Sequence, residues 1–331
     1  MKVGFIGTGN MGGALAHAAA QSPAPAELLL SNRTPEKAQA LAQQLGATVS
    51  DNETIAQTCD YIFLGVKPQM MADLLARLRP ILSRRQEGFV LVSMAAGLTL
   101  QRLREMAGLS CPILRIMPNT ACAVGAGLTL YVPSPEVTEE QLSAFLTLMS
   151  ASGRLEPLEE HLIDAGSAVA GCGGAFVSLF LEALADGAVT CGLPRDKARR
   201  YAAQMVLGTA QLALQSDQHT ATMKDAVCSP GGTTIAGVRA LERGGFRSAA
   251  MEAVIAAYEK TLALEKLTRP KRRGPSDGGL RPARRSAHHT SPFSGQKRPT
   301  GHADGAFETV EKTPGFSDKG LQSAVRIICV P

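Results

Sequence analysis

Short, nearly continuous apolar runs alternate with stretches of helical spacing along the first half of the chain. Runs of this kind, when helices join them, are typical of a parallel sheet that is covered on both faces. The predicted strands lie at 1–6, 27–31, 46–49, 61–66, 89–93, 113–117 and 128–132, with helices from Pro35 and over 139–149. We therefore expect a doubly wound, mostly parallel α/β sheet domain over residues 1–158.

The pattern changes at about Glu159, where Ala, Gly, Leu and Val dominate and strand-like runs become rare. The helix predicted over 175–191 has one apolar face, and its opposite side is also poor in charge. Such a helix is buried nearly all round, either against a second subunit or at the centre of its own helical bundle. Further helices are predicted from Thr234 and over 247–266, so residues 159–266 form an all-α domain.

Residues 267–331 have a different composition, with 7 Pro and 8 Gly and little apolar periodicity. They hold 12 Lys and Arg against 5 Asp and Glu, a charge of +7, whereas the whole chain carries +5. Composition predicts a disordered basic tail, a solvated appendage rather than an arm for nucleic acid or a membrane surface. The remaining residues carry only −2, so their charge gives no reason to expect nucleic acid as a partner.

The 331-residue chain has no run that approaches the length of a membrane span and no separate leader, so we expect a cytoplasmic location without membrane attachment. Its 7 cysteines are odd in number and scattered, and no Cys-x-x-Cys pair or neighbouring histidine accompanies them. We expect neither a disulfide framework nor a metal site.

A glycine motif, Gly7-x-Gly9-x-x-Gly12, follows the first apolar run and opens a helical pattern. A strand that feeds such a turn into a helix leaves backbone N–H groups pointing outward, where a pyrophosphate can bind. Gly7 allows the tight turn, Gly9 lets the backbone approach the phosphates, and Gly12 lets the helix pack on the strand. The sequence therefore predicts a dinucleotide-binding domain of the Rossmann type.

The choice of dinucleotide depends on residues 32–34, about twenty residues after the glycine motif. NAD-binding domains place an acidic side chain there, but this chain has Asn32-Arg33-Thr34. These side chains can donate to a 2′-phosphate, so NADPH is favoured and NADH is the weaker alternative. A solvated arginine in a turn is the structural alternative.

Ligands of such sheets bind beyond the carboxyl ends of the strands. That rule adds the strand ends at 66–68, 95–97 and 117–119 to the predicted cofactor cleft, although each could be a simple turn. The cofactor-binding residues are predicted to be Ile6, Gly7, Thr8, Gly9, Asn10, Met11, Gly12, Asn32, Arg33, Thr34, Val66, Lys67, Pro68, Ala95, Ala96 and Gly97.

A second unusual stretch, residues 224–237, has Ser229, Pro230, two glycines and two threonines ahead of a predicted helix. Hydroxyl groups next to the unpaired N–H groups of a helix start can hold a carboxylate without a cation. A capped loop between helices is the structural alternative.

With both stretches in view, residues 1–266 resemble the Δ1-pyrroline-5-carboxylate reductase family. The matching segments, in the family's order, lie at 5–12, 32–34, 66–69, 92–97, 115–120, 181–186, 192–194 and 225–237. The last of these, Asp-Ala-Val-x-Ser-Pro-Gly-Gly-Thr-Thr-Ile-Ala-Gly, is highly specific to the family.

The resemblance implies a Rossmann domain followed by an all-α dimerisation domain, in a homodimer or higher oligomer. It implies NADPH-dependent reduction of 1-pyrroline-5-carboxylate to L-proline, at a site between the cofactor cleft of one chain and helices of the dimer. Thr234 would hydrogen-bond the ring nitrogen as the catalytic group. The other implied contacts are Ser229, Gly231, Gly232, Thr233 and Glu160 to substrate and Asn52 to the adenosine side of the cofactor.

The chain departs from the family pattern at 171–176, where Cys172, Gly174 and Phe176 replace the usual Ser, Pro and Tyr. Two other functions stay open: a related NADP-dependent imine or β-hydroxyacid reductase, and a non-catalytic NADP-binding homologue. His219 is read as a solvated loop residue rather than a catalytic one.

Overall fold

The structure is a computed structural model that describes residues 1–24, 26–86 and 88–268. Residues 269–331 lie outside the described residues. They make up all but the first two residues of the predicted tail, 267–331, and they include Cys329. The tail prediction is therefore not tested.

One sheet forms the first half of the described chain, with strand order β3-β2-β1-β4-β5-β6-β7-β8. The strands are β1 Lys2–Ile6, β2 Glu27–Ser31, β3 Thr48–Val49, β4 Tyr61–Leu64, β5 Val90–Ser93, β6 Ile113–Met117, β7 Gly127–Pro133 and β8 Gly153–Pro157. The first six run parallel, β7 is antiparallel to β6, and β8 is parallel to β7. The predicted mostly parallel sheet is confirmed.

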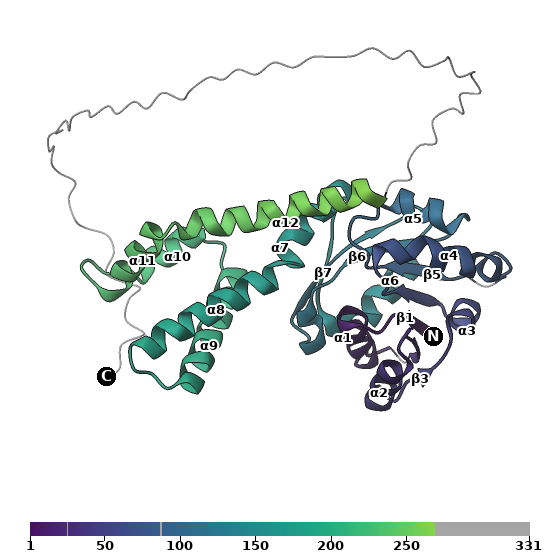
Figure 1. Ribbon diagram of the computed structural model, residues 1–331, viewed down its shortest axis with the longest axis horizontal. Coiled ribbons are helices and arrows are strands. Elements are labelled where there is room, and N and C mark those ends of the chain that lie inside the picture. The colour runs from purple at the N-terminus through teal and green to yellow at the C-terminus, as the bar shows by residue number, and fades with distance from the viewer. Residues whose placement is uncertain (25, 87, 269–331) are drawn as a thin grey trace, which may run out of the picture. The chain divides into compact units, whose positions relative to one another are not determined.

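Helices cover both faces of this sheet (Figure 1). They are α1 Asn10–Ala20, α2 Pro35–Leu45, α3 Asn52–Thr58, α4 Pro68–Leu82, α5 Leu100–Ala107 and α6 Glu139–Leu148. One apolar core joins α1, α2 and α6 to one face, and a second joins α3, α4 and α5 to the other. Two separate cores explain why the central strands are apolar on both sides.

Strand β8 was not predicted, and the reason is its composition. Arg154 and Glu156 alternate with apolar residues, and Pro157 ends the strand, so no continuous apolar run marks it. Its pairing with β7 at the edge of the sheet requires only one partner strand.

The second half of the described chain is helical, with α7 Ile163–Ala170, α8 Gly173–Thr190, α9 Arg195–Gln215, α10 Thr220–Ala226, α11 Thr233–Arg243 and α12 Phe246–Thr268. Helices α8 and α9 pack against each other, and α12 packs on α7, α8 and α11. The predicted sequence of a sheet domain and then an all-α domain is confirmed.

Helix α8 is covered only in part by its own chain, through α9 and α12. Within it only Ala185 is buried, and Leu179 is 68% exposed. On α9, Leu212 and Leu214 are 62% and 76% exposed. The prediction that helix α8 lies at the centre of its own bundle is therefore wrong. The apolar faces of α8 and α9 need a cover from outside the protomer.

By length and composition, the helical segment Glu160–Thr190 is apolar enough to span a membrane. Only 11% of the residues in the apolar stretch within it are buried. The expectation that no run approaches this length is thus wrong by that criterion. The segment is one 3-10 turn followed by α7 and α8, which meet at Gly171 and Cys172.

Candidate functional site

The glycine turn between β1 and α1 is held by close backbone contacts. Gly7 has φ 100°, in the left-handed region that favours glycine, and its N–H donates to the Ser31 carbonyl at 2.8 Å. A Cβ on Gly7 would lie 2.6 Å from the carbonyl oxygen of Gly65, at the end of β4. The turn therefore fits only with glycine at this position.

Gly9 and Gly12 differ in what surrounds them. A Cβ on Gly12 would overlap the Gly7 carbonyl oxygen, whereas a Cβ on Gly9 would meet nothing within 4 Å. The backbone at Gly9 thus faces open space at the start of α1, where unpaired N–H groups attract anions. Beside it, the buried Thr8 hydroxyl has no hydrogen-bond partner among the described residues.

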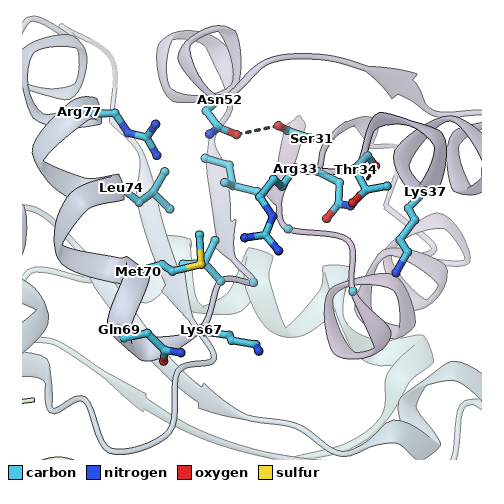
Figure 2. A pocket seen from close by; sticks show the side chains of 16 residues that line it. Ser31, Arg33, Thr34, Lys37, Asn52, Lys67, Gln69, Met70, Leu74 and Arg77 are labelled. Carbon is cyan, nitrogen blue, oxygen red and sulfur yellow. Dashed lines mark hydrogen bonds between the residues drawn. The ribbon is translucent and has the colours of Figure 1, made fainter. Parts of the chain in front are cut away.

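A cavity of about 770 Å³ opens beside this turn (Figure 2). Of the predicted cofactor residues, the structure brings Ile6, Gly7, Gly9, Asn32, Arg33, Thr34, Asn52, Val66 and Lys67 to its wall. Others do not line it: Thr8, Asn10, Met11 and Gly12 lie in the turn and first turn of α1, Pro68 begins α4, and Ala95, Ala96 and Gly97 follow β5.

Hydrogen bonds fix the polar side of the cavity. Asn32 accepts from the Thr8 N–H at 3.2 Å and donates to the Thr34 carbonyl at 3.0 Å. Asn52 accepts from the Ser31 hydroxyl at 2.7 Å. The guanidinium of Arg33 is exposed and lies between these groups and α4 (Figure 2).

Sequence reasoning missed part of the wall. The structure adds Ser31, Lys37, Gly65, Gln69, Met70, Leu74 and Arg77. Met70, Leu74 and Arg77 follow one another at helical spacing on α4, so a helix starting at Pro68 would have placed them on one face. Lys37 lies in the first turn of α2 and adds a positive charge near Arg33.

The second site lies in the bend between α10 and α11. Gly231 has φ 69°, and the Gly232 N–H donates to the Ser229 carbonyl at 3.0 Å. No side chain caps the start of α11 at Thr233, and Ser229, Thr233 and Thr234 are exposed. The bend thus presents hydroxyl and free N–H donors outward, an arrangement suited to a carboxylate.

Within one protomer the two sites are separate, because no residue of 229–234 lines the cavity. Glu160, implied as a substrate contact, does not line it either. Its carboxylate accepts from the Leu100 N–H at 2.5 Å and pairs with Arg115 at 3.4 Å.

His219 has a structural place: its Nδ1 accepts from the Ala221 N–H at 3.1 Å and caps α10. At the divergent segment 171–176, Cys172 precedes α8 without capping it, and Gly174 has open space where a side chain would lie. The chain's own contacts therefore do not explain the loss of the usual proline there.

Two buried cysteines, Cys59 and Cys111, are poor nucleophiles. Burial raises the pKa of the Cys59 and Cys111 thiols to about 11, so both are protonated near neutral pH. Among the described residues, no group of three or more His, Cys, Asp or Glu side chains is placed to hold a metal ion.

Comparisons with known proteins match both halves of the described chain. Residues 160–264 match the family model described as pyrroline-5-carboxylate reductase dimerisation, and residues 2–97 match NADP oxidoreductase, coenzyme F420-dependent. The chain is 39% identical over 268 residues to the pyrroline-5-carboxylate reductase of Escherichia coli (strain K12), covering 80% of this chain and 98% of that one. The chain belongs to the pyrroline-5-carboxylate reductase family.

Other members of the family are similar to this chain over nearly their whole length. The pyrroline-5-carboxylate reductase of Pisum sativum is 38% identical over 264 residues, covering 79% of this chain and 95% of its own. The structure of the Plasmodium falciparum enzyme with NADP bound matches with a TM-score of 0.71 and 33% identity, over 80% of this chain and 98% of that chain. The Streptococcus pyogenes enzyme has the same scores and coverage. The resemblance stated from the sequence is confirmed.

The cavity fits a phosphorylated dinucleotide on its own geometry. The open space at Gly9 can take a pyrophosphate, while Arg33 and Lys37 can donate to a 2′-phosphate. The wall lacks an acidic side chain that would repel that phosphate among its described residues.

Proposed function

We propose that this protein is an NADPH-dependent oxidoreductase that reduces 1-pyrroline-5-carboxylate to L-proline, the last step of proline biosynthesis. The observation that carries the proposal is the near full-length match to reductases of this name. The cavity beside the glycine turn and the donor-rich bend at 229–234 supply the two binding sites that such a reaction needs.

The substrate carboxylate binds at the bend between α10 and α11. Ser229, Thr233 and the backbone at Gly231 and Gly232 hold it without a cation. Thr234 donates to the ring nitrogen, where electron density increases as the C=N carbon is reduced. NADPH supplies the hydride, and the proton comes from solvent or from an already protonated imine.

The chain contributes orientation more than acid–base chemistry. Holding two reactants in an aligned geometry is worth up to about 7–11 kcal/mol of the barrier. The candidate pocket accordingly needs hydroxyl and amide donors rather than a catalytic His or Cys, which agrees with the capping position of His219.

Oligomerisation completes the site. The apolar segment 160–190 lies entirely inside the matched dimerisation region. We propose that a second subunit, not lipid, covers it, and that the protein acts in the cytoplasm as a homodimer or higher oligomer without nucleic acid. A monomer in sedimentation at micromolar concentration would contradict this.

Steady-state oxidation of NADPH by purified protein with 1-pyrroline-5-carboxylate tests the activity. Turnover at background level would overturn the proposed function. Thr234→Val should lower kcat about 10²–10³-fold, because a single donor to developing charge is worth that much. Thr234→Ser, which keeps the hydroxyl, is the matched control and should retain most of kcat.

A further inference from the structure

Arg115, at the centre of β6, is 1% exposed, although arginine side chains are always charged in proteins. Its guanidinium pairs with the Asp164 carboxylate at 2.5 Å and with Glu160 Oε1 at 3.4 Å. Burial of a guanidinium is costly unless carboxylates compensate it. The proposed chemistry uses none of these three groups.

Glu160 connects the buried Arg115 to the loop that follows β5, on the cofactor side of the sheet. Its Oε1 also accepts from the Leu100 N–H at 2.5 Å. Leu100 is the first residue of α5, three residues after Gly97, which ends the segment 95–97 predicted to line the cofactor cleft. One carboxylate oxygen thus binds a sheet arginine and the end of the loop after β5.

Asn119 makes a second link at the end of the same strand. Its Nδ2 donates to the Ala170 carbonyl at 3.1 Å, and its Oδ1 accepts from the Leu128 N–H at 3.4 Å. Helix α7 is therefore tied near both ends to residues at or just past β6, through Asp164 and Ala170. It also packs on α8 and α12 of the dimerisation region.

We propose that Glu160, held by Arg115, is a positioning residue that fixes the loop 95–99 relative to α7, and is not a ligand of the substrate. This rests on the proposed function. The loop and α7 belong to the two halves that must bring nicotinamide and substrate together. A misplacement of about 1 Å can cost about 10²-fold in rate.

Glu160 is the group to change, because it is one-third exposed and its loss leaves Arg115 paired with Asp164. Glu160→Ala should lower kcat about 10–10²-fold, while KM for 1-pyrroline-5-carboxylate and for NADPH stays within about twofold. Glu160→Gln keeps a carbonyl oxygen for the Leu100 N–H and should recover kcat to within about threefold. With NADPH deuterated at the transferred position, the isotope effect on kcat should rise in Glu160→Ala and return toward wild type in Glu160→Gln.

Glu136→Ala is the matched control. Glu136 pairs with Arg104 at 2.6 Å, so it also holds α5, but at the end away from Leu100. It should leave kcat and the isotope effect unchanged. Equal losses of kcat in the two alanine variants would overturn the proposal, as would a raised substrate KM with unchanged kcat in Glu160→Ala.

Amide hydrogen exchange on the protein without cofactor gives a readout that does not depend on turnover. The Leu100 amide should exchange faster in Glu160→Ala than in wild type and Glu136→Ala, and near wild type in Glu160→Gln. Unchanged exchange would overturn the inference. Lack of turnover by the wild-type protein would instead overturn the proposed function, so the two failures are distinguishable.

Discussion

The guanidinium of Arg33 projects into the cavity beside the glycine turn (Figure 2). It follows Asn32, whose side chain is already engaged with Thr8 and Thr34. Among the described residues no hydrogen bond or ion pair holds the exposed Arg33 guanidinium, so it can orient toward a ligand. Its charge suits the 2′-phosphate that distinguishes NADPH from NADH.

Arg33→Ala should raise KM for NADPH about 10–100-fold, because hydrogen bonds to charged groups contribute about 1.5–3 kcal/mol. KM for NADH should change little, since NADH has no 2′-phosphate. Steady-state kinetics with both cofactors measures this. Arg84→Ala, which removes an exposed arginine outside this cavity, is the control for net charge. An equal change for both cofactors would contradict the assignment.

At the scale of elements, helix α3 begins at Asn52, which lines the cavity. The side chain of Asp51 caps the start of this helix. Asp51 accepts from the Thr54 N–H at 2.6 Å and from the Thr54 hydroxyl at 3.1 Å. These hydrogen bonds, the backbone one first, lower the pKa of the Asp51 carboxyl below its usual value. The cap therefore stabilises the helix when Asp51 is ionised.

Asp51→Ala should lower the free energy of unfolding by about 0.5–1 kcal/mol near neutral pH, because this exposed cap is lost. The pKa of the Asp51 carboxyl is lower in the folded than in the unfolded protein. The stabilisation by the cap is therefore complete above the unfolded-state pKa, and it is lost as the pH falls through the folded-state pKa. Thermal unfolding from pH 7 to pH 3 should show the two proteins converging in acid. Asp51→Asn is the control, because it keeps a capping side chain that does not titrate. A difference in stability between wild type and Asp51→Ala that does not change with pH would contradict the role of the ionised cap.

Elements built from local signals were predictable. The apolar runs and the glycine spacing indicated the parallel strands and the turn at Gly7, because burial on both faces and a left-handed φ leave marks in the sequence. The edge strand β8 leaves no such mark, since it buries only part of its side chains.

Contacts between distant segments were not predictable. The wall residues Leu74 and Arg77 depend on which face α4 turns toward the sheet, and the pairing of Glu160 with Arg115 joins residues 45 positions apart. The resemblance implied a substrate contact for Glu160, whereas its observed partners are Arg115 and a backbone N–H. Its role there remains a proposal.

At the scale of the whole molecule, one protomer leaves two features incomplete. The apolar faces of α8 and α9 are exposed, and the bend at 229–234 does not line its own chain's cavity. A second subunit can resolve both, because a symmetric dimer buries the same surface on each chain and can present each bend to the partner. We propose that the active site then takes its cofactor cleft from one chain and its substrate bend from the other.

Two single variants isolate these halves. Gly9→Asp places a carboxylate where the pyrophosphate would bind, yet Gly9 has an ordinary φ of −70° and space for a side chain. Asp is also a good cap for α1, so folding should be unaffected while NADPH binding is lost. Thr234→Val removes the proposed donor on the bend and leaves the cleft unchanged.

Hybrid dimers, made by co-expression with two affinity tags, then decide the arrangement. A hybrid of Gly9→Asp and Thr234→Val chains has one intact cleft facing one intact bend, so it should recover about half of the wild-type activity per dimer. A hybrid of a wild-type chain with a chain carrying both changes should be inactive, because each site then contains one defect. If each chain used its own bend, the two results would be reversed, and the shared site would be excluded.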